Sequence, residues 1–205
     1  DLAIWMAEEY GTTLNQCLKT VLPVKKKTKN RTKPGKIQYG NPYPAPKLNA
    51  EQEEVLFAMQ EYFQEEEAPS ALLFGVTGSG KTELYLRLIE DCLAKGKEVI
   101  YLIPEISLSH QSRMRVEGRF PGQVAVLHSK MSQGERAESM EKCRSGEVKL
   151  LLGPRSALFA PFSNLGLIII DEEQERSYKS ETAPRYESRD VARKRGELAH
   201  CPVLF

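Results

Sequence analysis

The sequence predicts an α/β fold in which a parallel β-sheet is flanked by helices, and three observations indicate it. Short apolar runs recur from Ala71 onwards, and helical periodicity fills most of the segments between them. A glycine-rich stretch joins the first run to a helical segment, and an acidic cluster ends a later run. Runs that are apolar throughout are typical of strands buried on both faces, as in parallel sheets.

The elements before the sheet are expected to be helical, apart from one linker. Leu2 to Leu22 has helical character that breaks near Gly11. The following stretch is rich in Pro, Lys, Asn and Gly without an apolar period, which predicts a basic linker. Asn49 is a suitable N-cap for a helix to about Gln64. The expected divisions are a helical junction segment, the basic linker and a nucleotide-binding lobe, at residues 1–23, 24–47 and 48–205.

The expected strands of the lobe are its apolar runs, which are Ala71–Phe74, Val99–Ile103, Val124–Leu127, Leu150–Leu152 and Leu167–Ile170. The sequence ends at Phe205, inside what is predicted to be a further strand. Since a natural domain seldom ends within a strand, we expect the sequence to be a piece of a longer protein.

A phosphate-binding loop is predicted at residues 75–82, which read Gly75-Val76-Thr77-Gly78-Ser79-Gly80-Lys81-Thr82 and match G-x-x-x-x-G-K-[ST]. The loop joins a strand to a helix, as this motif requires. Glycines let backbone N–H groups approach phosphate oxygens, and the helix N-terminus adds its positive dipole end. We expect Lys81 to reach the β- and γ-phosphates and the Thr82 hydroxyl to ligate Mg²⁺. The predicted nucleotide-binding residues are Gly75, Thr77, Gly78, Ser79, Gly80, Lys81 and Thr82.

A second nucleotide motif is predicted where the run Leu167–Ile170 ends in Asp171-Glu172-Glu173. Asp171 would hold Mg²⁺, directly or through water, and Glu172 would polarise the water that attacks the γ-phosphate. With Lys81 these two acids form the predicted catalytic set. The alternative is an exposed helix start, which acidic residues favour. An Asp-Glu pair favours a hydrolysing motor over a small-molecule kinase.

Composition and charge set further limits. The net charge of +1 conceals basic stretches at 25–36 and 176–195 and an acidic one at 51–67. Such basic patches can bind nucleic acid, although they are also typical of solvated faces and linkers. No apolar run is long enough to span a membrane, and the four cysteines form no C-x-x-C pair. A reducing cytoplasm is therefore the expected compartment, with no disulfide framework or zinc site in this sequence.

The segments that follow the predicted strands resemble superfamily-two helicases, and closely the PriA family of primosomal replication-restart DNA helicases. The segments that carry the resemblance are Pro104-Glu105-Ile106-Ser107-Leu108, His128–Arg136, Gly153–Phe162, Ser177-Tyr178-Lys179, Pro184-Arg185-Tyr186 and Arg189-Asp190. The resemblance extends from about Leu48 to the end, and Leu2–Pro23 resembles the junction after that family's fork-binding domain.

This resemblance implies two RecA-like lobes, of which this sequence holds the first. It implies ATP and Mg²⁺ as cofactors, 3′-to-5′ translocation on forked and single-stranded DNA, and primosome proteins as partners of a monomeric enzyme. The family's zinc-binding cysteines belong further downstream. The second lobe and its arginine finger are outside this sequence, so this lobe alone is expected to bind ATP weakly and hydrolyse it poorly.

The resemblance also implies roles for single residues. Gln52 would recognise adenine through its amide, the alternative being an ordinary first-turn glutamine. Backbone amides, hydroxyls and arginine in the strand-end loops would lie near the DNA strand, at Pro104, Glu105, Ser129, Arg155 and Ser156. Pro104 as a strand stop and Ser129 as a helix cap are the alternatives.

The later loop carries further implied contacts. Tyr178 and Tyr186 would stack on bases and Arg185 would hold phosphate, although either tyrosine can instead pack against the domain. Two residues depart from the family pattern: Gln174 stands where His is usual, and Pro154 where Thr is usual. The 24–47 linker is also too short for the family's winged-helix domain.

Two other readings stay open from sequence. One is a different superfamily-two motor, acting on RNA or as a translocase. The other is a fork-binding assembly platform with a degenerate ATPase.

Overall fold

The computed structural model describes residues 1–22, 44–64, 69–76 and 78–205. Most of the predicted basic linker, and Thr77 of the predicted phosphate-binding loop, lie outside the described residues.

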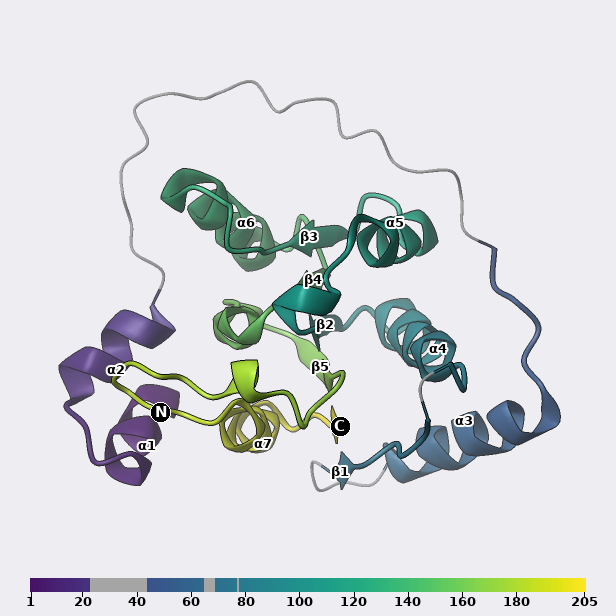
Figure 1. Cartoon of the computed structure of the whole chain (residues 1–205), viewed down its shortest axis with the longest axis horizontal. Coiled ribbons are helices and arrows are strands. Elements are labelled where there is room, and N and C mark those ends of the chain that lie inside the picture. Colours follow the sequence, from purple (N-terminus) through teal and green to yellow (C-terminus); the bar gives the residue numbers. More distant parts are fainter. Residues whose placement is uncertain (23–43, 65–68, 77) are drawn as a thin grey trace.

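The described residues contain one parallel sheet with the strand order β1-β6-β5-β2-β4-β3. Its strands are β1 (Ser70–Ala71), β2 (Glu98–Leu102), β3 (Val124–Val126), β4 (Leu150–Gly153), β5 (Leu165–Ile170) and β6 (Val203–Leu204). Figure 1 shows the sheet between two layers of helices, which confirms the predicted α/β class.

The helices are α1 (Leu2–Glu9), α2 (Leu14–Val21), α3 (Ala50–Tyr62), α4 (Lys81–Ala94), α5 (His110–Arg119), α6 (Gln133–Ser145) and α7 (Ser188–Ala199). Short 3₁₀ turns follow three strand ends, at η1 (Glu105–Ser107), η2 (Arg155–Phe159) and η3 (Arg176–Tyr178). The predicted break near Gly11 separates α1 from α2, and this glycine has a φ of 56°. The predicted N-cap Asn49 begins α3 with a reciprocal capping box.

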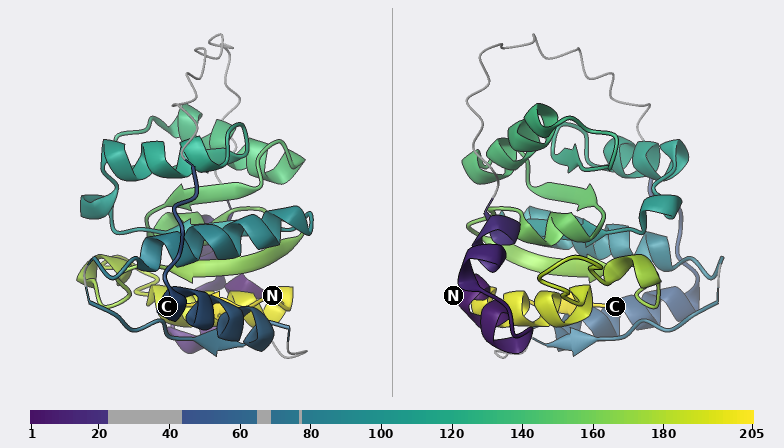
Figure 2. Two further views of the ribbon diagram at one scale, coloured as in Figure 1. Left: turned by 90° about the vertical axis from the view of Figure 1, so that its right-hand side faces the viewer. Right: turned by 60° about the vertical axis from the view of Figure 1, so that its left-hand side comes forward.

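Strands β2, β4, β5 and β6 are buried on both faces, and each face of the sheet has its own apolar core. Alternate residues of a strand point to opposite faces, so Ile100 and Ile168 join one core while Val99 and Ile169 join the other. Helices α1, α2, α6 and α7 contribute to the first core, and α3, α4 and α5 to the second. The views in Figures 1 and 2 show these two helical layers on either side of the sheet.

One predicted strand is less buried than expected. The run Ala71–Phe74 was predicted as a buried strand, but β1 is short and lies at the edge of the sheet beside β6. The Leu73 N–H still donates to the Phe205 carbonyl at 2.7 Å, while Leu72 and Phe74 are 64% and 91% exposed. The apolar pattern identified the strand but not its edge position, which depends on pairing with residues distant in sequence.

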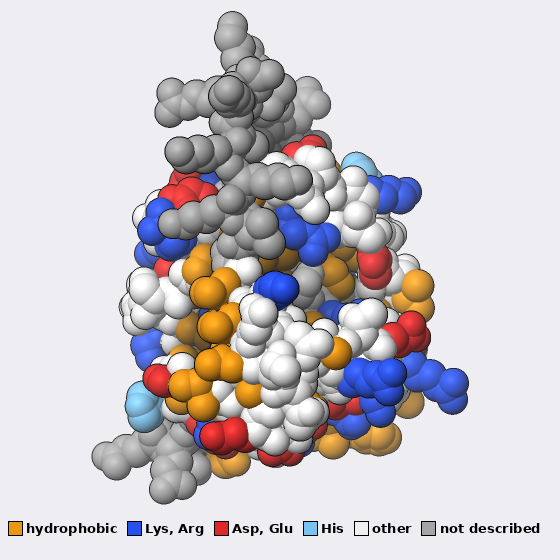
Figure 3. All heavy atoms as spheres, turned by 90° about the vertical axis from the view of Figure 1, so that its left-hand side faces the viewer, with side chains coloured by type: hydrophobic (Ala, Val, Ile, Leu, Met, Phe, Trp, Pro, Cys, Tyr) orange, Lys and Arg blue, Asp and Glu red, His pale blue; other side chains and the backbone are white. Residues whose placement is uncertain are grey.

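Helices α1 and α2 pack against each other, and α1 also packs against α7 on one face of the sheet. Figure 3 views the molecule from their side and shows apolar side chains on that surface. The exposed large apolar residues of these two helices are Ile4, Leu14 and Leu18, and Leu22 directly after α2 is exposed as well. None of the helices within the described ranges is long and apolar enough to cross a membrane.

Candidate nucleotide and nucleic-acid site

The glycine-rich loop leads from β1 into α4, at the carboxyl end of its strand. Gly78 and Gly80 have φ angles of 84° and 90°, in the left-handed region that glycine tolerates best. Gly80 is the N-cap of α4, so the first N–H groups of this helix face the loop. The Lys81 ammonium donates to the carbonyls of Gly75 and Val76 at 2.5 and 3.2 Å. The loop therefore combines free helix donors, positive-φ glycines and one lysine, which suits an anionic phosphate chain.

Gln52 connects helix α3 to this loop. Its Oε1 accepts the Asn49 N–H at 3.1 Å, and its Nε2 donates to the Ser79 carbonyl at 3.0 Å. A Cβ atom on Gly80 would lie 2.2 Å from the Gln52 Nε2 atom, so only glycine leaves room for this contact. Gln52 is thus in the nucleotide loop's immediate surroundings, and adenine recognition by its amide stays a prediction.

Asp171 follows β5, and its N–H donates to the Leu102 carbonyl at 3.0 Å. Burial raises the pKa of its carboxyl, and the Glu172 charge adds to that rise, whereas the Lys81 ammonium acts to lower it. The two predicted nucleotide motifs follow β1 and β5 of the same parallel sheet, so both lie at its carboxyl edge. Tyr101, whose hydroxyl lies 3.5 Å from Asp171 Oδ2, also meets Tyr85 of α4, the helix that the glycine-rich loop begins. A partly buried carboxylate at the same sheet edge as a phosphate-binding loop suits a bound cation, because a cation would offset the cost of the partly desolvated charge.

The two glutamates after Asp171 have different partners. Glu172 adopts a φ of 49°, which is uncommon for a residue with a side chain, and its Oε2 accepts the Gln174 amide at 2.7 Å. Glu173 forms an ion pair with Arg189 of α7 at 2.9 Å. Gln174, which departs from the family pattern, therefore holds the predicted water-polarising carboxylate through a hydrogen bond.

The loops after β2 and β3 meet. Glu105 Oε1 accepts the Ser129 N–H at 2.7 Å, and the hydrogen bonds from Ser129 lower the pKa of Glu105. Pro104 is buried and accepts the Ser107 N–H at 2.9 Å, whereas Ile106 is 84% exposed. These predicted DNA-side residues are thus gathered at one edge of the sheet, but DNA contact by them stays a prediction.

The Arg155 side chain forms hydrogen bonds within the protein. Its Nη1 donates to the Ser177 carbonyl at 3.0 Å and also to the Lys179 carbonyl. It therefore ties the loop after β4 to the loop after β5. Its neighbour Ser156 is partly exposed, and Pro154 accepts the Ala157 N–H at 2.8 Å as the turn begins.

Tyr178 and Tyr186 were predicted to stack on bases, but the structure places both rings inside the protein. They are 1% and 5% exposed. The Tyr178 hydroxyl donates to the Asp171 carbonyl at 2.7 Å, and the Tyr186 ring meets Phe159 edge-on at 5.4 Å. Both rings therefore pack against the domain, which was the alternative prediction, and neither presents a face on which a base can stack. Arg185 between them is exposed, as a phosphate contact requires.

Sequence reasoning missed the tyrosines that surround Asp171. The Tyr101 hydroxyl lies 3.5 Å from Asp171 Oδ2, and its ring meets that of Tyr85 edge-on. Burial and the Asp171 charge raise the pKa of both phenols. Both residues occur within apolar stretches of a strand and a helix, so no local pattern distinguished them from ordinary core residues.

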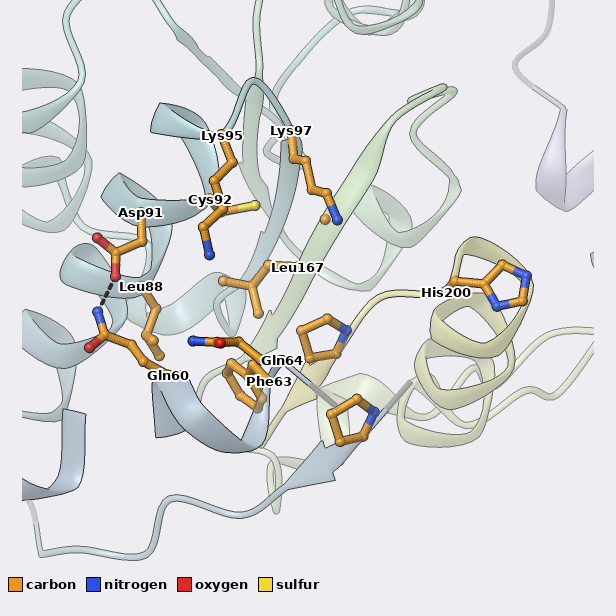
Figure 4. Close-up of a pocket in the computed structure, with 13 residues that line it drawn as sticks. Gln60, Phe63, Gln64, Leu88, Asp91, Cys92, Lys95, Lys97, Leu167 and His200 are labelled. Carbon is orange, nitrogen blue, oxygen red and sulfur yellow. Dashed lines mark hydrogen bonds between the residues drawn. The ribbon is translucent and has the colours of Figure 1, made fainter. Parts of the chain in front are cut away.

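A separate pocket of about 350 Å³ lies at the other end of α4, near the starts of β5 and β6. Figure 4 shows its lining, with Lys95, Lys97 and His200 around Leu167 and Phe63, and with Gln60 hydrogen-bonded to Asp91. None of the predicted site residues lines this pocket.

The glycine-rich loop and the acidic strand end, brought together at the carboxyl edge of a parallel sheet, define a P-loop α/β lobe. A model of the DEAD/DEAH box helicase family matches residues 50–195, which include both motifs. The chain belongs to the DEAD/DEAH box helicase family.

Curated relatives confirm the resemblance to PriA. The chain is 53% identical to replication restart protein PriA of Bacillus subtilis over 77% of its length, covering 20% of that protein. It is 41% identical to PriA of Treponema pallidum over 99% of its length, and 39% identical to PriA of Helicobacter pylori over 93%. The chain spans 20%, 30% and 29% of the lengths of these three relatives.

Proposed function

We propose that this chain is an ATP-binding motor lobe of a DNA helicase that acts in replication restart. The observation that carries the proposal is that the phosphate-binding loop and the partly buried Asp171 carboxylate lie at the carboxyl edge of one parallel sheet, where the Tyr101 hydroxyl contacts Asp171 and the Tyr101 ring contacts Tyr85 of α4. Family membership and the replication-restart names of the relatives support the class of activity.

The residues present suit ATP and Mg²⁺. Lys81 and the N–H groups of the glycine-rich loop would bind the phosphates, while Thr82 and Asp171 would hold the metal ion. Bound Mg²⁺ would neutralise charge on the β- and γ-phosphates. Glu172, held by Gln174, would orient the attacking water.

The remaining features of the proposed function rest on the family resemblance and on the relatives. They are 3′-to-5′ translocation, action at stalled forks with primosome proteins, monomeric state and a cytoplasmic location. Loops after β2, β3 and β4 would contact the DNA strand through Glu105, Ser129 and Ser156, with Arg185 on a phosphate.

The experiment that tests the proposal is steady-state ATP turnover of the intact protein with forked DNA, with single-stranded RNA and with neither. Stimulation by the fork alone supports a DNA motor. Fork binding without stimulation favours an assembly platform. Preference for RNA would overturn the assignment to replication restart while leaving the nucleotide site standing.

Lys81→Ala should reduce fork-stimulated ATP turnover of the intact protein by on the order of a hundredfold or more. The substitution removes the ammonium group that would stabilise negative charge on the phosphates in the transition state. Lys95→Ala, at the exposed far end of the same helix, is the matched control and should leave turnover unchanged. Unchanged turnover in Lys81→Ala would contradict the nucleotide-site assignment.

A further inference from the structure

A buried carboxylate lies in the first turn of α4, two residues after Lys81. Glu83 is 3% exposed, and neither the predicted nucleotide site nor the DNA loops include it. Its carboxylate lies 3.2 Å from Arg87 Nε, 3.5 Å from Arg115 Nη2 and 3.4 Å from Arg119 Nη1. A charge this deeply buried is retained only where several partners offset its desolvation.

The partners come from two helices. Arg87 belongs to α4, whereas Arg115 and Arg119 lie one turn apart on α5. Glu90 completes the group, with Arg119 Nη2 at 3.1 Å and Arg87 Nη1 at 4.0 Å from its Oε2. We call these five residues the Glu83 cluster. Figure 1 shows α4 and α5 side by side on one face of the sheet, and ion pairs of the Glu83 cluster connect the two helices.

The distances between Glu83 and its arginines suit an ion-pair network that can rearrange. The Glu83 distances are longer than the 2.7–2.9 Å of a tight charge-assisted hydrogen bond, and three guanidinium groups share one carboxylate. Small displacements of α5 can therefore redistribute these contacts without breaking all of them. Because the Glu83 and Arg119 side chains are buried, the contact between them acts on α4 with little screening by solvent.

Helix α5 is in turn connected to a predicted DNA loop. It begins directly after residues 104–108, with Ser109 as its N-cap. The Ser112 hydroxyl donates back to the Ser107 carbonyl at 3.1 Å, so the loop and the first turn of α5 are fastened together. On the α4 side of the Glu83 cluster, Glu83 directly follows Thr82 and lies in the same helical turn as Lys81.

We propose that Glu83 is a positioning residue that couples the DNA-side loop to the nucleotide loop through Arg115 and Arg119. DNA bound at residues 104–108 would shift α5, and the Glu83 cluster would pass the shift to the first turn of α4. This rests on the proposed function.

The test uses the intact protein with Arg115→Met and Glu83→Gln, each alone and combined. Arg113→Met is the matched control, since Arg113 lies on the same helix and pairs only outside the cluster, with Glu117, among the ion pairs of the described residues. The measurements are ATP turnover without DNA, turnover with saturating forked DNA, fork affinity and thermal unfolding. Arg115→Met is the primary variant because its side chain is 31% exposed, so its replacement is compatible with folding.

Stimulation by the fork should fall about tenfold in Arg115→Met, while turnover without DNA and fork affinity stay within about twofold of the parent. The combined variant should lose no more stimulation than the stronger single variant, because both residues act through one contact. Full stimulation in Arg115→Met would overturn the inference. A parent protein that the fork does not stimulate would instead overturn the proposed function.

Discussion

At the residue scale, Asp171 shows how a side chain proposed to bind metal can oppose stability. Its carboxyl lies beside Tyr85 and Tyr101, its backbone carbonyl accepts the Tyr178 hydroxyl, and burial raises the pKa of the carboxyl. A metal-binding role needs the charged form, which is the form that burial disfavours. The sequence predicted Asp171 from its place after an apolar strand, but the tyrosines that make its surroundings come from α4, β2 and η3.

Asp171→Asn should therefore reduce ATP turnover by on the order of a hundredfold or more, yet raise the free energy of unfolding at neutral pH. A raised folded-state pKa means that the cost of the charge is absent below the ordinary pKa of 3.8, grows as pH rises from 3.8 to the folded-state pKa, and is complete above it. The gain in Asp171→Asn should be full at neutral pH and should shrink as the pH falls toward 3.8, as measured by urea unfolding at neutral pH and near pH 3.8.

The control for this prediction is Asp190→Asn. The Asp190 side chain is 46% exposed and lies 3.8 Å from Arg193, so its effect should stay within about 0.5 kcal/mol at either pH. A loss of stability in Asp171→Asn that is equal at both pH values would show that burial of charge does not govern this site.

At the scale of elements, the segment after β5 is built as a closed loop. The Ser180 N–H donates to the Tyr186 carbonyl at 2.8 Å, and the buried Ser188 hydroxyl donates to the Tyr178 carbonyl at 2.6 Å. Arg155 binds the same segment from the loop after β4. Its two tyrosines are therefore anchors that shape the loop, whereas Arg176, Lys179 and Arg185 are exposed on it.

Tyr186→Ala should lower the free energy of unfolding by about 3–5 kcal/mol, because it removes a buried ring and its edge-on contact with Phe159. Tyr186→Phe keeps the ring and should cost about 1 kcal/mol or less. Urea unfolding of the three proteins measures this difference.

Arg185→Ala is the functional counterpart, and it should weaken fork binding by the intact protein without changing stability. Tyr186→Ala with unaltered stability but weakened fork binding would restore the base-stacking role that the burial of this ring argues against.

At the scale of the whole molecule, charge is segregated along the chain although the net charge is only +1. The basic stretch at 25–36 lies outside the described residues, so its role rests on composition. Basic side chains that contact phosphates release counterions, and DNA affinity then falls steeply with salt.

Replacing Lys25, Lys26 and Lys27 by Ala in the intact protein should weaken fork binding and flatten its salt dependence. Each lost phosphate contact lowers the slope of log affinity against log salt by about 0.9 on duplex DNA. Titrations at several salt concentrations measure the slope. Lys142→Ala with Arg144→Ala is the control, since both side chains form ion pairs on α6. An unchanged slope in the triple variant would show that this stretch only spaces the domains.

The extent to which the sequence predicts this protein can be seen in particular elements. Apolar runs located the strands to within a few residues, and Asn49 and Gly11 marked helix boundaries, because capping and periodicity are local. The exposure of Leu72 and Phe74 was not predictable from the same pattern, because it depends on which strand lies beside β1. The inward placement of Tyr178 and Tyr186 was likewise decided by non-local packing.

The sequence by itself therefore determined the class of fold, the phosphate-binding motif and the helicase family, since each is carried by a short run of residue types. Only the tertiary structure decided that Tyr101 lies beside Asp171, that Arg155 donates to backbone carbonyls and that Glu83 is shared among arginines of two helices. The physical reason is that burial, pKa and ion pairing depend on groups brought together from distant parts of the chain.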